Sequence, residues 1–312
     1  MSKTIFVTGA AGYIGSILIP RLLDRGNAVI ALDTYSRGDT ALAHVAANPN
    51  FEPVRGDARD EDVLRDLIPR ADVIIPLAAL VGAPLCKQDA IAAKTTNYDA
   101  IISLLNLMGK DQRIIYPTTN SGYGIGQKGV FCTEETPLNP ISLYGVTKVE
   151  SEKAILDRGN GISLRLATVF GMAPRMRIDL LVNDFTYRAV TDRAVVIFEG
   201  DAKRNYIHIR DVVKAFEHAI DNYDSMKGEP YNVGLSSANL SKLELCDKIR
   251  EYVPGFVSLT APIGEDPDKR DYIVSNEKIE RTGWMPDHTI EMGIQELIRG
   301  YRMIRNGRYS NI

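Results

Sequence analysis

The sequence has few cysteines and no excess of positive charge. Its 312 residues include three cysteines, Cys86, Cys132 and Cys246, which lie far apart, and no Cys-x-x-Cys pair occurs. A disulfide framework or a cysteine zinc site is therefore not expected, no metal is expected, and a reducing compartment fits best. The formal net charge of −3 leaves no basic excess to hold a polynucleotide, so nucleic acid is not an expected partner.

Long apolar runs are also missing. The longest one, residues 73–85, is interrupted by Pro76, Gly82 and Pro84 and is too short to span a bilayer. The first residues lead directly into a strand pattern, without the charged, apolar and cleavage regions of a signal peptide. We therefore expect a cytoplasmic protein that does not associate with membranes.

The first half of the chain alternates short β-branched runs with longer helical patterns. Strands at this spacing from helices predict βαβ units and an α/β fold, a Rossmann-like doubly wound parallel sheet. The predicted strands cover residues 4–8, 28–32, 51–55, 73–75, 113–116 and 161–166. The predicted helices cover residues 13–25, 61–68, 90–108 and 145–158.

The pattern changes after about Phe170. Helices are predicted at residues 178–191, 211–222, 241–252 and 290–305, and short strands at 195–198, 206–209 and 231–233. No linker rich in proline, glycine or serine separates the two halves, and no repeat is visible. We therefore predict a Rossmann domain at residues 1–170 and, at 171–312, mainly a smaller mixed α/β lobe interwoven with it.

The loop after the first predicted strand carries three regularly spaced glycines. Residues 8–15 read Thr-Gly-Ala-Ala-Gly-Tyr-Ile-Gly, between a strand and a helix. Glycine lets the backbone approach a pyrophosphate, and the helix N-terminus offers N–H donors to that anion. A turn without a ligand is the alternative interpretation, but the context favours a dinucleotide site. The candidate cofactor residues in this loop are Gly9, Gly12, Tyr13, Ile14 and Gly15.

An acid ends the second predicted strand. Asp33 can accept hydrogen bonds from both hydroxyls of the adenosine ribose and would repel a 2′-phosphate. NAD is therefore expected in preference to NADP, although Arg37 nearby would weaken that preference. A solvated turn residue is the alternative interpretation of Asp33.

Two further strand ends supply candidate cofactor residues. Asp57 and Ala58 follow the third strand, and Leu77, Ala78 and Ala79 follow the fourth. Ligands of open α/β sheets bind at the carboxyl ends of strands. Asp57 can accept from the adenine amino group, and the small side chains would let a cofactor approach, although turn and packing roles explain the same residue types.

Tyr144 and Lys148 lie four residues apart at a predicted helix start. Positions i and i+4 share one helical face, and a neighbouring ammonium favours phenolate. We therefore expect Lys148 and a cationic nicotinamide to lower the pKa of Tyr144, which would take the proton from a sugar hydroxyl. Lys148 would also hold the nicotinamide ribose. Thr119, at the end of the fifth strand, would present its hydroxyl to the same substrate oxygen.

These residues together resemble the extended short-chain dehydrogenase family of NAD-dependent nucleotide-sugar epimerases, dehydratases and reductases. The resemblance covers nearly the whole chain and includes residues 8–15, 57–58, 119–124, 144–148, 165–171, 204–212 and 268–272. It implies an enzyme with tightly held NAD and a nucleotide-sugar substrate. It also implies a homodimer built from paired helices, here near residues 90–108 and 145–158.

Departures from the family's patterns narrow the chemistry. The 4,6-dehydratases carry an Asp-Glu pair directly after the catalytic threonine, where this chain has Asn120 and Ser121. These two residues are expected to contact the substrate, and dehydration is not expected. The 3,5-epimerases use a cysteine with a second acid, but Cys86 and Cys132 are better explained as small buried side chains. Oxidation at C4 remains, followed either by release of the ketone or by re-reduction in a 4-epimerase.

Three segments resemble bacterial GDP-D-glycero-manno-heptose 4-dehydrogenases of capsule-sugar synthesis. They are residues 74–87, 119–126 and 180–188. This resemblance ranks C4 oxidation of a GDP-linked heptose above 4-epimerisation of another nucleotide sugar. It also implies that a 2-oxo acid such as 2-oxoglutarate reoxidises the bound NADH.

The nucleotide end of the substrate is expected to meet the smaller lobe. Arg204 and Arg270 stand where relatives place arginines on the diphosphate, and Asn183 resembles a contact to the sugar diphosphate. A guanidinium suits bidentate phosphate contact, although surface ion pairs explain arginine equally. His208 is expected to be structural. A non-catalytic dinucleotide-binding regulator is a further alternative, but such proteins often lose Tyr or Lys of the pair.

Overall fold

The computed structural model describes residues 2–38, 40–261 and 270–304. Its centre is a seven-stranded parallel sheet with the strand order β3-β2-β1-β4-β5-β7-β11, which confirms the predicted Rossmann-like fold. The strands are β1 (Thr4–Thr8), β2 (Ala28–Asp33), β3 (Phe51–Arg55), β4 (Val73–Pro76), β5 (Arg113–Thr119), β7 (Gly161–Leu166) and β11 (Pro230–Val233).

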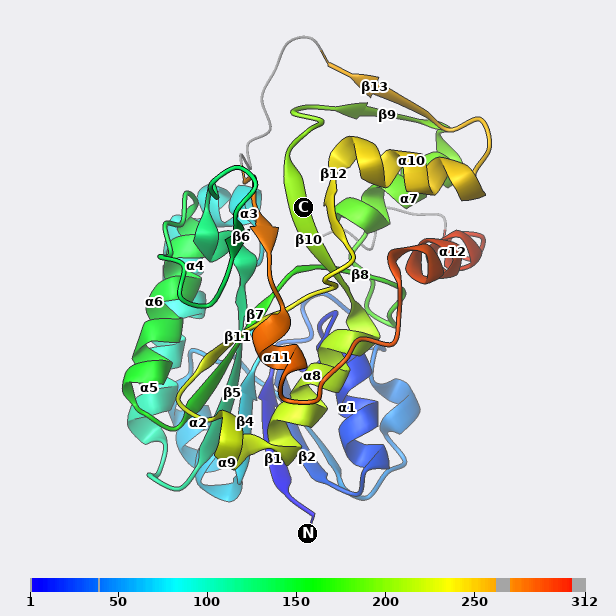
Figure 1. Cartoon of the computed structure of the whole chain (residues 1–312). Coiled ribbons are helices and arrows are strands. Elements are labelled where there is room, and N and C mark those ends of the chain that lie inside the picture. Colours follow the sequence, from blue (N-terminus) through cyan, green and yellow to red (C-terminus); the bar gives the residue numbers. More distant parts are fainter. Residues whose placement is uncertain (1, 39, 262–269, 305–312) are drawn as a thin grey trace.

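Helices cover both faces of this sheet. Side chains alternate along a strand, so Ile5 and Val7 of β1 join one core cluster while Phe6 joins another. The first cluster includes residues of α1 (Gly15–Asp24) and α8 (Ile209–Asp221). The second includes residues of α2 (Glu61–Leu67), α5 (Ala100–Leu107) and α6 (Leu143–Asp157), on the left in Figure 1. Burial on both faces explains the nearly continuous apolar strands.

The helix predicted at residues 90–108 is interrupted. It consists of α4 (Ala90–Lys94), a π-helical turn η3 (Thr95–Asp99) and α5. Within the turn, the buried Asn97 accepts the Leu80 N–H at 2.8 Å and donates to the Leu80 carbonyl at 2.9 Å. The π turn thus places an amide against the loop that follows β4, and such turns are frequent at functional sites.

The smaller lobe lies beyond the carboxyl ends of the strands, at the top of Figure 1. It contains three helices, α7 (Leu181–Thr191), α10 (Lys242–Tyr252) and α12 (Ile290–Gly300), in the described part of the chain. Two small sheets complete it: β12 (Asn239–Ser241), β10 (Lys203–His208) and β8 (Thr168–Phe170) in one, and β13 (Val257–Thr260) with β9 (Ala194–Ile197) in the other.

Segments after residue 170 also return to the large sheet. β11 pairs with β7, and α8 packs against α1, where Arg25 forms an ion pair with Asp221 at 2.8 Å. The boundary near residue 170 stays a prediction. None of the helices in the described ranges has the length and apolar character needed to cross a membrane.

Several short elements were not predicted. They are α3 (Ala83–Gln88), α9 (Tyr223–Met226), α11 (Glu277–Glu280), β6 (Phe131–Cys132), β14 (Ile273–Val274), η1 (Ala43–Val45), η2 (Ile68–Arg70) and η4 (Asn120–Tyr123), besides β8, β12 and β13. Elements this short carry too few residues for a periodic pattern. The last predicted helix ends at Gly300, and residue 305 lies outside the described residues.

Candidate functional site

A cavity of about 500 Å³ lies at the carboxyl ends of the central strands. Residues of the sheet domain and of the smaller lobe both line it, and its position is where open α/β sheets bind ligands. The lining includes most of the predicted site residues: Gly9, Gly12, Tyr13, Ile14, Gly15, Asp33, Asp57, Ala58, Leu77, Ala78, Ala79, Thr119, Ser121, Tyr144, Lys148 and Arg270.

The glycine loop brings the ends of β1 and β4 close together. Gly9 has a φ of +66°, and a Cβ there would lie 2.6 Å from the backbone nitrogen of Ala78. A Cβ on Gly15 would lie 2.2 Å from the Ala10 carbonyl oxygen. Gly9, Gly12, Ile14 and Gly15 line the cavity beside the N-terminus of α1. A glycine loop at a helix N-terminus fits the pyrophosphate of a dinucleotide.

Two carboxylates line the cavity at the ends of β2 and β3. Asp33 accepts the Ala11 N–H at 2.9 Å and the Tyr35 N–H at 2.8 Å, so the acid is fixed at the end of β2 beside the glycine loop. The Asp57 carboxylate is paired with Arg59, whose Nη2 lies 2.6 Å from Oδ2. Hydrogen bonds from Arg59 hold the pKa of Asp57 below its usual range. Arg59 also lines the cavity, and no motif in the sequence pointed to it.

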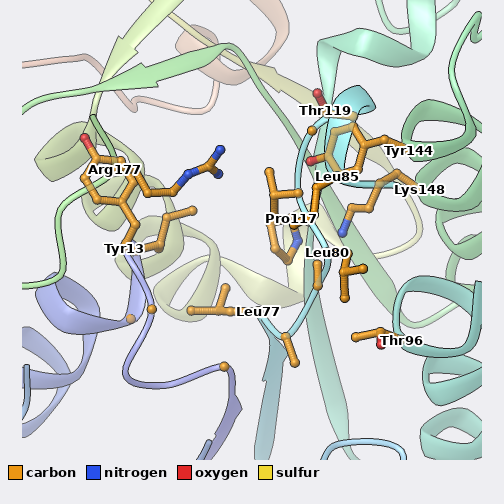
Figure 2. Close-up of a pocket in the computed structure, with 18 of the residues that line it drawn as sticks. Tyr13, Leu77, Leu80, Leu85, Thr96, Pro117, Thr119, Tyr144, Lys148 and Arg177 are labelled. Carbon is orange, nitrogen blue, oxygen red and sulfur yellow. The ribbon is translucent and has the colours of Figure 1, made fainter. Parts of the chain in front are cut away.

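Three predicted catalytic residues converge on one side of the cavity. Thr119 ends β5, while Tyr144 and Lys148 lie one turn apart near the start of α6. Ser142 caps this helix by accepting the Gly145 N–H at 3.2 Å, which fixes where the helix begins. Figure 2 shows these three side chains together, opposite Arg177.

The electrostatics differ from the expectation that Lys148 acidifies Tyr144. Burial raises the pKa of Tyr144 to about 12, and the charges that oppose this rise belong to Arg177 and Arg270, with further help from hydrogen bonding to Thr119. Burial likewise lowers the pKa of Lys148 to about 7. The apolar surroundings disfavour the charged form of both groups, and Lys148 is not among the main causes of the Tyr144 shift. That Lys148 and a cationic nicotinamide together lower the pKa of Tyr144 stays a prediction.

Arg270 reaches the threonine end of the site. Its guanidinium donates to the Ser121 hydroxyl, which lies 2.8 Å from the Thr119 hydroxyl. A polar chain therefore runs from Arg270 through Ser121 to Thr119, next to Tyr144. Of the resemblance segment at residues 268–272, Asp268 and Lys269 lie outside the described residues.

Three predicted substrate residues do not line the cavity. Asn183 is fully buried: its amide oxygen accepts the Gly171 N–H at 3.0 Å, and its amide nitrogen donates to the Tyr13 hydroxyl at 3.1 Å. Arg204 is buried and lies 5.8 Å from the centre of the Tyr272 ring. Asn120 is also buried, and neither of its amide atoms has a hydrogen-bond partner among the described residues. Their substrate contacts stay predictions.

Other side chains of the cavity were underestimated or missed. Arg175 and Arg177 line it together with Thr96 and Thr168. Burial lowers the pKa of Arg175, and the charges of Arg37 and Arg177 lower it further. Mutually repelling cations around one cavity favour anionic ligands.

Cys86, Cys132 and His208 have structural surroundings. All three cysteines are buried, and burial raises the pKa of the Cys86 thiol. His208, Asp211 and His288 bring possible ligand atoms within 4.8 Å of one another. However, His208 accepts the Arg210 N–H at Nδ1 and lies 2.7 Å from Glu296 at Nε2. Asp211 accepts the backbone N–H of His288 at 3.1 Å. Hydrogen bonds within the fold thus account for this cluster.

A family model matches most of the chain. The model described as "NAD dependent epimerase/dehydratase family" matches residues 5–234. The chain belongs to the NAD-dependent epimerase/dehydratase family. The match spans the glycine loop, Asp33 and the Thr119, Tyr144 and Lys148 cluster, so the family's cofactor, NAD, agrees with the cavity described above.

Relatives cover nearly the same length. The chain is 30% identical over 308 residues to the low-salt glycan biosynthesis protein Agl12 of Haloferax volcanii, covering 95% of this chain and 98% of that protein. It is 29% identical to a UDP-glucose 4-epimerase of Lactobacillus helveticus, covering 91% and 92%. The solved structure of a Thermotoga maritima UDP-glucose 4-epimerase with UDP-glucose is 25% identical, with a TM-score of 0.85 and coverage of 96% and 99%. This member of the epimerase/dehydratase family is thus an NAD-dependent enzyme of nucleotide-sugar chemistry.

Proposed function

We propose that this chain oxidises C4 of a nucleotide-linked sugar, and that the sugar is GDP-D-glycero-manno-heptose, used for capsule or surface polysaccharide. The observation that carries the oxidation is the convergence of Thr119, Tyr144 and Lys148 in a cavity that Asp33 also lines. The choice of GDP-heptose is supported by the resemblance of residues 74–87, 119–126 and 180–188 to the heptose 4-dehydrogenases.

Each of the three catalytic residues has a separate role in the proposed reaction. Bound NAD+, held by the glycine loop, Asp33 and Lys148, would supply the acceptor for the hydride that leaves C4. Tyr144 takes the proton of the C4 hydroxyl at its phenolic oxygen, so that the alcohol loses one hydride and one proton and becomes a ketone. Thr119 holds the same substrate oxygen by a hydrogen bond. Lys148 holds the nicotinamide ribose and keeps it beside Tyr144.

Tyr144 needs help to ionise because burial raises its pKa to about 12. The positive charges of Arg177 and Arg270 favour the phenolate and oppose that rise. In the proposed reaction these two arginines therefore make proton acceptance easier as well as attracting the substrate's diphosphate. Asn120, Ser121, Asn183 and Arg204 complete the proposed substrate contacts, with Asn183 and Arg204 acting only after a rearrangement of their present hydrogen bonds and stacking.

We also propose a second substrate, an oligomeric state and a location for this protein. A 2-oxo acid, 2-oxoglutarate, would reoxidise the bound cofactor, as the resemblance to the heptose 4-dehydrogenases implies. Two copies of the chain would pair through α5 and α6 and their neighbours in a homodimer. Ile91, beside this surface, is a large exposed apolar side chain, which is consistent with such pairing. The proposed location is the cytoplasm.

A 4-epimerase is the second candidate. The UDP-glucose 4-epimerases similar to this chain favour it, because an epimerase needs the same oxidation at C4 and then a return of the hydride. Asn120 and Ser121 suit either outcome, since both lack the acidic side chains of a dehydratase. The two candidates differ only in whether the ketone is released.

Product analysis separates the candidates. The purified protein is incubated with GDP-D-glycero-manno-heptose, UDP-glucose and UDP-glucuronate, with and without 2-oxoglutarate, and products are followed by mass spectrometry and NMR. Loss of two hydrogens from the GDP-heptose supports the proposal, whereas unchanged mass with inverted C4 supports the epimerase. Tyr144→Phe is the control, which keeps cofactor and fold but loses turnover. Absence of any reaction with these nucleotide sugars would contradict both candidates.

A further inference from the structure

A buried ion pair lies directly behind the candidate catalytic residues. Glu152 of α6 and Arg165 of β7 are 3% and 5% exposed. Arg165 Nη2 lies 2.6 Å from Glu152 Oε1, and its Nε lies 3.1 Å from both carboxylate oxygens. This side-on geometry is the strong, bidentate form of an arginine–carboxylate pair.

The pair is tied into two strands of the sheet. Glu152 Oε2 also accepts the Thr118 hydroxyl at 2.9 Å and the Ser163 hydroxyl at 2.5 Å. At its other end, Arg165 Nη1 donates to the Tyr123 hydroxyl at 3.1 Å. Thr118 and Arg165 stand opposite each other in the β5–β7 pairing. One carboxylate of α6 is thus held by β5 and β7 simultaneously.

These contacts connect the elements that carry the proposed chemistry. Glu152 follows Lys148 by four residues, as Lys148 follows Tyr144, so the three side chains share one face of α6. Thr118, which binds Glu152, immediately precedes Thr119. The carboxylate of Glu152 therefore fixes the register between the helix that carries Tyr144 and Lys148 and the strand that carries Thr119.

We propose that Glu152 and Arg165 form a positioning pair for the proposed oxidation: their buried contact holds α6, which carries Tyr144 and Lys148, against β5 and β7. The proposal rests on the function proposed above. Neither residue lines the cavity, so the pair acts through Lys148, Tyr144 and Thr119.

The charge of Glu152 bears directly on Lys148. The Lys148 ammonium faces the ring of Tyr116 on β5 and lies on the same helix face as Tyr144 and Glu152. Burial lowers the pKa of Lys148, and the charge of Glu152 opposes that lowering. Removing the carboxylate charge would therefore make the ammonium lose its proton at lower pH, and Arg165, left without its partner, would act in the same direction.

The decisive variant is Glu152→Gln, which keeps the shape and removes the charge. Its matched control is Glu150→Gln, an exposed glutamate on the same helix. NAD+ affinity is measured without sugar from pH 6 to 10, and the rate of NAD+ reduction by the active nucleotide sugar is measured over the same range. We expect Glu152→Gln to lower that rate about 100-fold through misplacement. We also expect it to move the alkaline loss of NAD+ affinity about one unit lower in pH.

Two outcomes would overturn the proposal. One is a Glu152→Gln protein that matches Glu150→Gln at every pH; the other is a loss of rate with no shift of either pH profile, which indicates a merely structural pair. Glu152→Asp keeps the charge and is expected to lose rate without shifting the profile. If Glu152→Gln does not fold, Glu152→Gln with Arg165→Gln removes the uncompensated buried charge and is judged by the same readouts.

The NAD+ arm separates this proposal from the proposed function. If the wild-type protein oxidises no nucleotide sugar, the proposed function fails, while the pH dependence of NAD+ affinity still tests the effect of Glu152 on Lys148. If the wild-type protein oxidises a nucleotide sugar and the profiles of the variants coincide with it, only the positioning pair fails.

Discussion

The Lys148 ammonium lies 3.9 Å from the centre of the Tyr116 ring, a buried cation–π contact between α6 and β5. The ring faces the lysine from the side of the sheet, while Lys148 itself is 4% exposed. Because burial disfavours the ammonium, an aromatic face that attracts a cation compensates part of that cost. The Tyr116 ring therefore stabilises the protonated form of Lys148, although Tyr116 has no proposed role in the reaction itself.

Replacing that ring should weaken the site. Tyr116→Leu removes the contact, which is worth about 0.5–2 kcal/mol, so we expect NAD+ affinity near pH 7 to fall roughly 2- to 30-fold. Tyr116→Phe keeps the ring and should bind NAD+ nearly as the wild-type protein does. Isothermal titration of the two variants checks this prediction. Equal losses in both variants would show that the hydroxyl matters rather than the ring.

The arginines of the cavity predict a pH dependence. The Arg177 charge lowers the pKa of Tyr144 against the opposing effect of burial, so its removal should raise that pKa. Since the proposed reaction needs the phenolate, the acid limb of the pH–rate profile in Arg177→Met should move to higher pH. Arg177→Lys keeps a cation there and should restore most of the profile. A pH profile that is unchanged in Arg177→Met would contradict this electrostatic role.

Strands and motifs that depend on a local sequence pattern could be predicted from the sequence. β1, β3 and β7 have the bounds that alternation of strands and helices predicted. The glycine loop and Asp33, which the spacing of a dinucleotide site singled out, line one cavity. The interruption of the helix predicted at 90–108 depends instead on the contact of Asn97 with Leu80, 17 residues away. A local periodic pattern cannot predict a contact between residues that lie so far apart in the sequence.

Long-range packing also decided which candidate site residues reach the cavity. Asn183 binds Tyr13, 170 positions earlier in the chain, and this bond turns its amide away from the cavity lining. The electrostatics of Tyr144 and Lys148 could not be predicted from their spacing, because burial shifts both pKa values toward the neutral forms. Residue type and spacing therefore identified the pair but not its charge state.

Replacing Asn183 should distinguish a structural role of this residue from a role in substrate binding. Its amide joins α7 to the Gly171 backbone and to Tyr13 of the glycine loop. Asn183→Leu leaves those buried partners unsatisfied and should lower the free energy of unfolding by about 1–3 kcal/mol per lost partner. Asn50→Ala, at an exposed position, is the control. Denaturant titration measures the change, whereas a raised KM at unchanged stability would instead favour a substrate contact.

The Glu296 carboxyl group should make the stability of the fold depend on pH in the acid range. Burial alone would raise the pKa of Glu296, but hydrogen bonds from His208 at 2.7 Å and from Arg210 at 2.6 Å lower it to about 2. A carboxyl group whose folded pKa lies below its unfolded value of about 4.5 stabilises the fold above the unfolded pKa. That contribution, roughly 3 kcal/mol from the size of the shift, disappears as the pH falls from about 4.5 to about 2.

Glu296→Gln should therefore be less stable than the wild-type protein at pH 7, and the difference should shrink as the pH falls below about 4.5. The reason is that the wild-type carboxylate becomes protonated there and loses its advantage over the neutral amide. Denaturant titrations at several values between pH 3 and 7 measure the difference. Glu291→Gln on the same helix is a useful comparison, because the carboxyl group of Glu291 is held by Lys248 and not by His208. A difference between wild-type and Glu296→Gln that stays constant across this range would show that the charge of Glu296 does not stabilise the fold.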